Sequence, residues 1–226
     1  MYNLIAHRGI DSSKFGENTK EGVIDALSKE YISGAEFDVR ITRDNKIVII
    51  HDLTINRTSD GAGFVSKMTY RNLKKYNFGT EENPSRICLL SDMLSSVNDD
   101  KILLIEVKCE VCDEDRFLKY FARTIKNFRD KNIYIMSFNG DIIKKIKKKC
   151  SFLRCGVLIG SIINFNYINE NFDFIAISSY STGKVKDYEK PIFIWALNSK
   201  KKYCELLEKM NKKTYYIVDF PVNFID

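Results

Sequence analysis

Several residue types are scarce in this sequence of 226 residues, and each shortage narrows what the protein can be. Three prolines and eleven glycines leave no Pro- or Gly-rich linker, so no domain boundary is indicated. No apolar run reaches the roughly 18 residues of a membrane-spanning helix, and the first residues lack the basic-then-apolar pattern of a secretory leader. We therefore expect a single domain over residues 1–226, in a cytoplasmic protein without stable membrane insertion.

Six cysteines are scattered along the chain, and two pairs of them are close in sequence. Cys109-x-x-Cys112 and Cys150-x4-Cys155 could together supply the four thiolates of a structural zinc site. Their spacings are loose, however, and neither pair lies in a recognisable zinc knuckle. We therefore expect reduced, mostly buried cysteines, as is usual in a cytosolic protein.

Charge is only slightly unbalanced, with 36 Lys and Arg against 30 Asp and Glu and a formal net charge of +6. Five lysines crowd between Lys144 and Lys149, and smaller groups lie at 200–202 and 212–213. A solvated helix face is the simplest interpretation, and an anionic surface such as lipid headgroups or nucleic acid is the alternative. Because no aromatic-plus-basic motif of a nucleic-acid module accompanies the lysines, we expect no nucleic-acid partner.

Short apolar runs rich in β-branched residues alternate with longer segments of helical period along most of the chain. This alternation predicts an α/β fold with a parallel sheet. Eight such runs favour a closed (β/α)8 TIM barrel, which a chain of this length is just long enough to form. The expected strands are Asn3–Ala6, Ala35–Val39, Ile102–Val107, Ile133–Ser137, Cys155–Ile159, Phe174–Ile177, Ile192–Ala196 and Tyr215–Val218.

Helices are expected between the strands. The first, Thr19–Tyr31, opens behind Asn18 and Thr19, two residue types that favour the N-cap position. The segment after Ile159 is short and rich in asparagine, and it gives no clear indication. The other expected helices are Asp115–Phe128, Asp141–Lys149 and Lys200–Lys209.

One stretch interrupts the alternation. Asp44–Asn45 predicts a turn, and Lys46–His51 predicts a side strand that stands outside the eight. From about residue 53 to residue 100 there is no clean barrel strand, and Gly61-Ala62-Gly63 lies within this range. We expect these residues to form a small insertion after the second strand region, over one mouth of the barrel.

The chain has only two histidines, and both stand at the C-terminal ends of expected strands. His7 ends the first strand, and His51 ends the side strand and is followed by Asp52. In a β/α barrel the C-terminal ends of the strands form the active-site face. A lone histidine is more often structural, so the inference rests on the shared position of both. Two imidazoles can divide proton transfers near neutral pH, and we expect His7 and His51 to be catalytic.

Two pairs of ionisable residues lie two apart on expected strands, so the members of each pair share a face. Glu36 and Asp38 would enter the barrel mouth together, and Glu106 and Lys108 would do the same on the next strand. Buried carboxylates side by side are costly without a cation. Glu36, Asp38 and Glu106 therefore predict an oxygen-ligand site for Mg²⁺ or Ca²⁺. The alternatives are carboxylates paired with arginines and a plain Glu106–Lys108 ion pair.

Further residues of the expected mouth suit an anionic substrate. Arg8 offers a guanidinium for phosphate, and Lys108 offers a second positive charge. Together with a metal they would offset the charge of a phosphodiester and stabilise its transition state. Trp195 could hold a glycerol carbon chain or a choline cation against its indole face, although plain barrel core is the alternative. Glu17 could anchor Arg8 or approach the metal.

The ordered set of motifs resembles the glycerophosphodiester phosphodiesterase family over nearly the whole chain. Departures are Gly16 in place of a proline, Cys88 within Ile87-Cys88-Leu89-Leu90, and Val218 before Asp219, and they bear on the insertion more than on the chemistry. The matching motifs are Ala6-His7-Arg8-Gly9, Glu17-Asn18-Thr19, Gly34-Ala35-Glu36-Phe37-Asp38-Val39, Val48-Ile49-Ile50-His51-Asp52, Arg57-Thr58, Gly61-Ala62-Gly63, Leu104-Ile105-Glu106-Val107-Lys108, Ser137-Phe138, Trp195-Ala196-Leu197-Asn198 and Val218-Asp219-Phe220-Pro221.

The resemblance implies a β/α barrel with an insertion after the second histidine, and metal ligands at Glu36, Asp38 and Glu106. It implies His7 as the base and His51 as the acid, an order that could be reversed. The products would be an alcohol and glycerol 3-phosphate, with a cyclic phosphate as a possible intermediate. Asp219 could stabilise a loop or contact the substrate.

Three other functions are open at this stage. The same site with a greasier mouth could act on lysophospholipids in the manner of a phospholipase D. A catalytically inactive barrel could serve as a binding module, but that reading predicts a lost histidine or carboxylate, and all are present. Nucleic-acid binding through the lysines predicts a steep salt dependence without metal.

Overall fold

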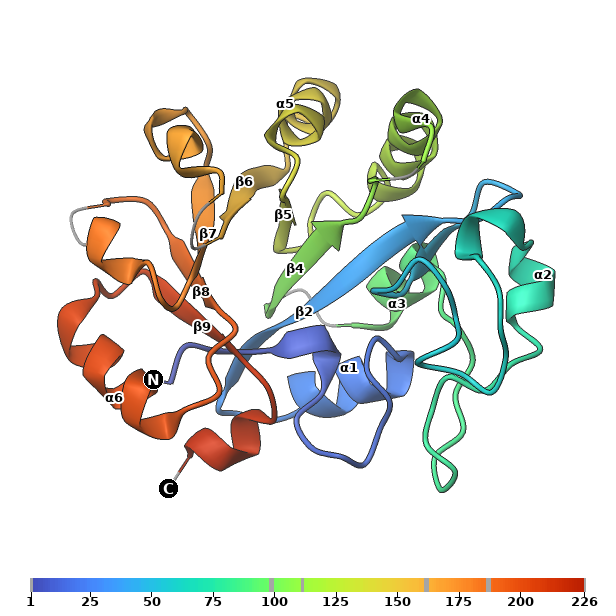
Figure 1. Cartoon of the computed structure of the whole chain (residues 1–226), viewed down its shortest axis with the longest axis horizontal. Coiled ribbons are helices and arrows are strands. Elements are labelled where there is room, and N and C mark those ends of the chain that lie inside the picture. Colours follow the sequence, from blue (N-terminus) through green and yellow to red (C-terminus); the bar gives the residue numbers. More distant parts are fainter. Residues whose placement is uncertain (1, 98–99, 111, 161–162, 186–187, 226) are drawn as a thin grey trace.

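Eight parallel strands close into a barrel in the computed structural model, which describes residues 2–97, 100–110, 112–160, 163–185 and 188–225 (Figure 1). The sheet runs β1-β9-β8-β7-β6-β5-β4-β2, and parallel pairing of β1 with β2 closes it. This confirms the expected TIM barrel. The barrel strands are β1 (Leu4–Ala6), β2 (Ile32–Ile41), β4 (Ile102–Val107), β5 (Ile133–Ser137), β6 (Arg154–Ile159), β7 (Phe174–Ser178), β8 (Ile192–Trp195) and β9 (Thr214–Val218).

The remaining strand, β3 (Ile47–Ile49), pairs antiparallel with β2 and is the expected side strand. β2 extends to Ile41, further than the sequence indicated, because its last residues pair with β3 rather than with a barrel neighbour. The chain reverses between the two strands through Asn45, which has a φ of 63° in the left-handed region that asparagine tolerates. This hairpin places the end of β3, and so His51, beside the mouth of the barrel.

Helices cover the outside of the barrel, and side-chain caps define several of their first residues. Thr19 caps α1 (Lys20–Leu27), Asp113 caps α4 (Glu114–Ile125), Asn139 caps α5 (Gly140–Lys149) and Ser199 caps α6 (Lys200–Lys209). α3 (Leu90–Ser96) completes this set, while the described residues after β6 and β7 form only the 3₁₀ turns η3 (Phe165–Asn169) and η4 (Thr182–Lys184). The short asparagine-rich segment after Ile159 thus contributes a 3₁₀ turn.

The hydrophobic core has an inner layer inside the barrel and an outer layer between the strands and the helices. On β4, Leu104 belongs to the inner layer, whereas Leu103 and Ile105 belong to the outer one, as the alternation of side chains on a strand requires. Residues two positions beyond an inner-core residue therefore point into the mouth. The inner layer is Ile5, Ile102, Leu104, Tyr134, Met136, Leu158, Phe174, Ala176, Phe193 and Ile217.

The segment between β3 and β4, which we expected to be an insertion over residues 53–100, has two parts. Its first part contains η2 (Val65–Lys67) and α2 (Tyr70–Leu73) and has its own small core. Its second part is α3, whose Leu90, Met93 and Leu94 join the outer core of the barrel. Residues 98 and 99 of the expected range lie outside the described residues. The small core consists of Val48, Ile50, Ile55, Val65, Leu73, Phe78 and Ile87.

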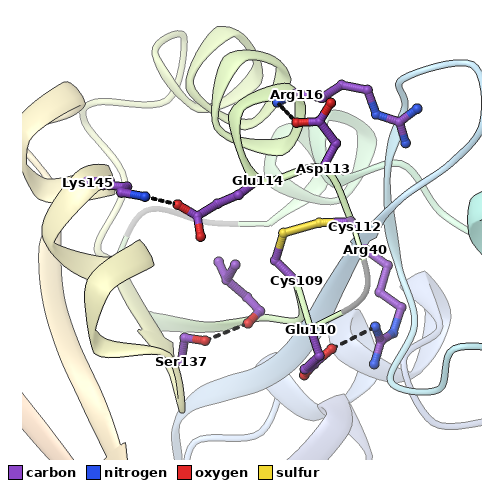
Figure 2. Close-up of a disulfide and its surroundings, with 10 residues drawn as sticks. Arg40, Cys109, Glu110, Cys112, Asp113, Glu114, Arg116, Ser137 and Lys145 are labelled. Atoms are coloured by element: carbon purple, nitrogen blue, oxygen red, sulfur yellow. Dashed lines mark hydrogen bonds and ion pairs between the residues drawn. A yellow bond between two sulfur atoms is a disulfide. The ribbon is translucent and has the colours of Figure 1, made fainter.

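The expectation that all cysteines are reduced is wrong for one pair. Cys109 and Cys112 form a disulfide in the loop after β4 (Figure 2), because that loop brings their Cα atoms to 5.3 Å. Cys88, Cys150 and Cys155 are free and buried, and Cys204 is free and exposed. The pair of Cys109 and Cys112 is thus not available to join Cys150 and Cys155 in a four-thiolate zinc site.

The lysines on α5 are largely neutralised by neighbouring carboxylates. Lys144 pairs with Glu170, Lys145 with Glu114, and Lys147 with Asp173. These ion pairs favour a solvated helix face over an anionic partner. Within the described part of the chain, no helix is long and apolar enough to cross a membrane.

Candidate active site

One cavity of about 210 Å³ at the C-terminal end of the barrel collects nearly all of the predicted site residues. Its polar side is His7, Arg8, Glu36, His51, Glu106 and Lys108. Its apolar side is Met136, Phe138, Leu158, Trp195, Ala196 and Ile217. Asp38, the one predicted residue that does not line the cavity, lies against its wall beside Glu36 and Glu106.

The three predicted metal ligands converge. Glu36, Asp38 and Glu106 each bring a carboxylate oxygen within 4.8 Å of the other two, and all three residues are buried. The cause is strand register, because Asp38 on β2 is the direct neighbour of Glu106 on β4, and Glu36 shares the inward face with Asp38. Among the described residues this is the one group of three or more His, Cys, Asp and Glu side chains arranged for a metal ion.

The hydrogen bonds of these carboxylates leave part of their capacity unused. Asn18 holds Asp38 twice: its Nδ2 donates to Asp38 Oδ2, and its Oδ1 accepts from the Asp38 backbone N–H, both at 3.0 Å. The Arg8 amide donates to Glu36 Oε2 at 2.9 Å. Asp38 Oδ1 is buried without any hydrogen-bond partner. Although Lys108 Nζ lies 3.5 Å from this oxygen, the oxygen has unused capacity, and together with the oxygens of Glu36 and Glu106 it forms the kind of donor set that a hard divalent cation takes.

The pKa values of the clustered carboxylates also favour a bound cation. Burial raises the pKa of Glu36 well above its usual value, and the charges of Asp38 and Glu106 raise it further. Burial, followed by the charge of Asp38, raises the pKa of Glu106 to about 7, although Lys108 opposes the shift. The cations of the protein therefore do not fully compensate this cluster, and a bound metal ion would.

Lys108 forms the ion pair that was one of the sequence alternatives, and it also lines the cavity. Its Nζ lies 2.6 Å from Glu106 Oε1 and 3.5 Å from Asp38 Oδ1. Burial alone would lower the pKa of Lys108, but the charges of Asp38 and Glu106 outweigh it and raise the pKa. Lys108 is thus a fixed positive charge beside the carboxylates.

The Nδ1 atom of His7 is hydrogen-bonded to a carboxylate. It begins the 3₁₀ turn η1 (His7–Gly9) at the end of β1, and its Nδ1 lies 2.6 Å from Asp219 Oδ1. The hydrogen bond from His7 lowers the pKa of Asp219. An ionised carboxylate can only accept, so Nδ1 is the donor and a neutral His7 has its lone pair on Nε2. That nitrogen lies 3.9 Å from Glu36 Oε2.

His51 has the same arrangement with its neighbour in sequence. Its Nδ1 lies 2.7 Å from Asp52 Oδ1. Burial lowers the pKa of His51 despite the opposing effects of Asp38 and Asp52. Both imidazoles thus carry a carboxylate on Nδ1 and leave Nε2 for proton transfer. Two imidazoles in this arrangement can act chemically as a proton acceptor and a proton donor.

A chain of ion pairs connects the two histidine positions. Arg8 Nη1 donates to Glu17 Oε1 at 2.9 Å, which shows that Glu17 anchors Arg8. Arg57 donates to both oxygens of Glu17 at 2.7 and 2.8 Å and to both oxygens of Asp52 at 2.7 and 2.9 Å. Burial would raise the pKa of Glu17, but the bonds from Arg57 and Arg8 lower it. The hydrogen bond from Arg57 is the main cause of the low pKa of Asp52.

Trp195 has features of both roles considered from the sequence, contact with the substrate and packing in the barrel core. It ends β8, lies above the inner core and packs edge-on against Phe138, with ring centroids 5.6 Å apart. It also lines the cavity, and its Nε1 has no hydrogen-bond partner in the protein. The position is compatible with contact to a substrate carbon chain.

Four residues with clear contacts in the site were given no settled role from the sequence. Asp219 was detectable, because it stands two positions after the inner-core residue Ile217. Asp52 was detectable as the direct neighbour of His51. Asn18 acts from a left-handed conformation with a φ of 57°, and Arg57 acts from the irregular segment after β3. No periodic pattern could have indicated these two.

The chain is similar to known proteins over most of its length. A glycerophosphodiester phosphodiesterase from Caldanaerobacter subterraneus is 32% identical over 161 residues, and the match spans 69% of this chain and 65% of that protein. An uncharacterized protein of Bacillus subtilis is 31% identical over 172 residues, which cover 72% of this chain and 69% of that one.

Solved structures share the fold. A glycerophosphodiester phosphodiesterase from Thermotoga maritima superposes with a TM-score of 0.79 at 25% identity, covering 99% of this chain and 97% of that chain. A phosphodiesterase from Oleispira antarctica, solved with the product sn-glycerol-3-phosphate, superposes with a TM-score of 0.86 at 22% identity, covering 98% and 94%. The model of the glycerophosphoryl diester phosphodiesterase family matches residues 7–204, and the chain belongs to that family.

Proposed function

We propose that this protein hydrolyses glycerophosphodiesters to an alcohol and glycerol 3-phosphate, with a divalent metal ion and with His7 and His51 as its acid–base pair. One observation carries the proposal: three buried carboxylates and two carboxylate-held imidazoles converge on a single cavity. Among the described residues, neither imidazole has a carboxylate within hydrogen-bond distance of its Nε2. In a purely structural pair of histidines there would be no reason for both Nε2 atoms to lack such a partner. Family membership supports the reaction class, and the relatives' names support the substrate class.

Glu36, Asp38 and Glu106 are the residues that would hold the metal. Their all-oxygen donors suit Mg²⁺ or Ca²⁺ rather than zinc. When bound, the ion supplies positive charge that offsets the charge of the phosphodiester. Arg8 and Lys108 add two further positive charges on the same side of the cavity. Arg8 Nε has no hydrogen-bond partner in the protein, which leaves a donor for a phosphate oxygen.

The two histidines then divide the proton transfers. His7 Nε2 accepts the proton of the glycerol hydroxyl that attacks phosphorus, and Asp219 stabilises the imidazolium that forms. His51 Nε2 donates a proton to the oxygen of the leaving alcohol as its bond to phosphorus breaks. Burial lowers the pKa of His51, which makes its protonated form a stronger acid and means that the protonated form is more populated below neutral pH than above it.

In the second stage, hydrolysis of the cyclic phosphate returns His7 and His51 to their starting protonation states. Neutral His51 Nε2 takes a proton from water as the water oxygen attacks the cyclic phosphate. Protonated His7 Nε2 returns its proton to the glycerol oxygen as the ring opens. The products leave with His7 neutral and His51 protonated, as at the start.

The cavity suits a small polar substrate with a short carbon chain. Its volume of about 210 Å³ is below the roughly 300–1,000 Å³ of sites that enclose drug-sized ligands. The apolar lining, with Phe138 and Trp195 at the ends of β5 and β8, comes from other strands than the charged residues and would contact the carbon atoms of glycerol. An acyl chain would have to lie outside, so we propose soluble glycerophosphodiesters over lysophospholipids.

Release of glycerol 3-phosphate from a panel of glycerophosphodiesters tests the proposal. We expect turnover of glycerophosphocholine or glycerophosphoethanolamine that EDTA abolishes and that Mg²⁺ or Ca²⁺ restores. Lysophosphatidylcholine in the same assay tests the phospholipase-D-like alternative, for which the lysolipid would be the better substrate. Absence of metal-dependent turnover across the whole panel would leave a binding module and would contradict the proposal.

A further inference from the structure

The disulfide of this protein follows directly after two residues of the proposed active site. Glu106 and Lys108 stand at the C-terminal end of β4, and Cys109 comes next along the chain. Cys109 closes on Cys112 before α4 begins at Glu114 (Figure 2). Nothing in the proposed hydrolysis uses a cysteine, so the disulfide at this position calls for its own explanation.

A short series of contacts leads from the disulfide to His51. Glu110, which lies between the two cysteines, places Oε2 3.0 Å from Arg40 Nη1 (Figure 2). The other end of the Arg40 guanidinium donates from Nε to the backbone carbonyl of His51 at 2.7 Å. Arg40 and Cys112 also line one small cavity together with Lys108. The loop that the disulfide closes therefore follows Lys108 directly in the chain and is linked to the His51 backbone through Arg40.

Arg40 depends on Glu110 for its charge balance. The Arg40 side chain is 10% exposed, whereas that of Glu110 is 56% exposed. Glu110 is thus an acid with access to solvent that is kept beside a buried cation. The disulfide limits how far Glu110 can move, because both cysteines that flank it are fixed to each other.

The accessibility of the sulfur atoms sets this pair apart. Cys109 and Cys112 are both partly exposed. Cys88, Cys150 and Cys155 are buried, and burial raises the pKa of each thiol, to about 12 for Cys88 and Cys155. Such thiols react poorly. Cys204 is exposed but has no disulfide partner, so it serves as a matched control.

We propose that Cys109 and Cys112 are a thiol–disulfide exchange site for dithiols, and that its oxidation state sets the turnover of the active site. The second half of this inference rests on the function proposed above. A thiolate of the dithiol attacks one sulfur of the Cys109–Cys112 bond, which breaks and leaves a mixed disulfide. The second thiol of the dithiol then attacks the mixed disulfide. Two electrons and two protons pass to the cysteines, and the reagent leaves as its own disulfide.

Reduction acts on catalysis through Arg40. With the loop open, Glu110 moves into solvent and the buried guanidinium loses its counter-charge next to the Lys108 cation. Arg40 then shifts and releases the His51 carbonyl, so the His51 imidazole is less well placed. Because displacements below 1 Å at a reacting group change rates strongly, we expect reduction to lower kcat about tenfold. KM should change less, since Arg8 and the apolar lining residues come from elements other than β4 and the loop after it.

The test sets the redox state of the metal-loaded enzyme with mixtures of reduced and oxidised dithiothreitol. Alkylation followed by mass spectrometry measures the fraction of the Cys109–Cys112 disulfide, and release of glycerol 3-phosphate measures kcat in the same samples. We expect kcat to follow the disulfide fraction. Cys204→Ser should respond as the wild type does.

Two variants make the result decisive. The double variant Cys109→Ser, Cys112→Ser should have the activity of the reduced wild type in every mixture, which also controls for metal chelation by dithiothreitol. Glu110→Gln keeps the disulfide but weakens the ion pair, so it should have low kcat that does not depend on redox state.

The outcomes separate this inference from the proposed function. Turnover that is equal with the disulfide open and closed overturns the inference, as does a pair that alkylation finds reduced in every mixture. A Glu110→Gln variant that still responds to dithiothreitol overturns the route through Arg40. Absence of turnover in both redox states would instead overturn the proposed function.

Discussion

The two halves of the barrel mouth carry different chemistry on the same backbone plan. The ionisable residues of the mouth come from β1, β2 and β4, whereas β5, β6 and β8 and the residues that directly follow them supply apolar side chains to the same cavity. The ionisable set is His7, Glu36, Asp38, Glu106 and Lys108, joined by His51 from the end of β3. The apolar set is Met136, Phe138, Leu158 and Trp195.

The difference shows how a closed barrel can separate two tasks. Side-chain alternation delivers inward residues from every strand, and the strand order then decides which of them meet. Because β2 lies between β1 and β4, the charged residues are gathered on one arc. β9 closes the circle next to β1, which explains why Asp219 reaches His7. The charged arc would bind the phosphate, and the apolar arc would bind its carbon substituent.

Removing a metal ligand should break the charged arc most severely. Glu36→Gln removes one of three converging carboxylates, and we expect kcat/KM to fall about 10³-fold or more, since metal charge stabilisation is worth several kcal/mol. Glu114→Gln, at an ion pair with Lys145 outside the cavity, is the matched control and should retain wild-type rates. Steady-state kinetics at saturating metal would measure both. Full activity of Glu36→Gln would show that Glu36 is not a ligand.

Loss of either imidazole should be nearly as damaging. His7→Ala and His51→Ala each remove a proton-transfer group, which is typically worth about 10²–10⁴ in rate. Both variants should fold, because each imidazole is only partly buried. Activity assays with thermal melts would test this. A large drop in Tm with little loss of kcat would identify a structural histidine.

The carboxylates behind the imidazoles should matter less than the imidazoles themselves. In Asp219→Asn and Asp52→Asn the amide can turn its NH₂ toward Nδ1 and so favour the other tautomer. We expect kcat to fall about 10- to 100-fold, as for a small misplacement of a reacting group. The pH dependence of kcat would separate this effect from unfolding. An unchanged rate and pH profile in Asp219→Asn would reduce Asp219 to a loop contact.

The sequence allowed us to predict the barrel and the convergence of the residues at its mouth, because both follow from the periodicity of strands and helices. Strands of period two and helices with capping residues were visible along the chain, and α6 lies at the bounds expected for it, Lys200–Lys209. The pairing of Glu36 with Asp38, and of Glu106 with Lys108, followed from the same period. His51 followed from the end of a short β-branched run.

What the sequence could not supply depends on irregular backbone. Arg57 reaches both Glu17 and Asp52 from a segment held by its own small core, and no pattern relates these residues. Asn18 holds Asp38 from a backbone conformation with a positive φ, which no periodic pattern indicates. The Cys109–Cys112 disulfide could not be predicted from the sequence either. A Cys-x-x-Cys spacing is compatible with a disulfide, a metal site or free thiols, and only the conformation of the loop decides between them.

The pH dependence of the stability of the metal-free protein should reveal the raised pKa values of the carboxylates in the charged arc. The raised pKa values of Glu36 and Glu106 mean that the folded state keeps protons that the unfolded chain releases above its ordinary value of 4.5. Unfolding thus releases protons, and stability should fall as pH rises from about 4.5 through about 7. At this chain length about 1 kcal/mol shifts Tm by about 2–4 °C, so we expect a fall of several degrees.

A variant isolates this contribution from that of His51. The lowered pKa of His51 acts in the opposite sense, since the unfolded chain binds its proton more readily up to about the ordinary value of 6.5. Glu106→Gln should therefore lose part of the downward slope between pH 5 and 7, and Mg²⁺ or Ca²⁺ should stabilise the wild type more at pH 7.5 than at pH 5. Melting curves across pH would measure this. A wild-type Tm that rises throughout the window would contradict the shifts.

The apolar arc should give the smallest effect, and the most informative one about substrate choice. Trp195→Phe keeps an aromatic ring beside Phe138 but removes the unpaired Nε1–H and part of the indole face. We expect KM to rise about three- to tenfold with kcat nearly unchanged, because a change of this size in an apolar wall costs about 1 kcal/mol. If the indole holds a cation, the rise should be larger for glycerophosphocholine than for a substrate with an uncharged alcohol. Equal rises for both substrates would place Trp195 against the glycerol carbons, and no rise in either would leave it as barrel core.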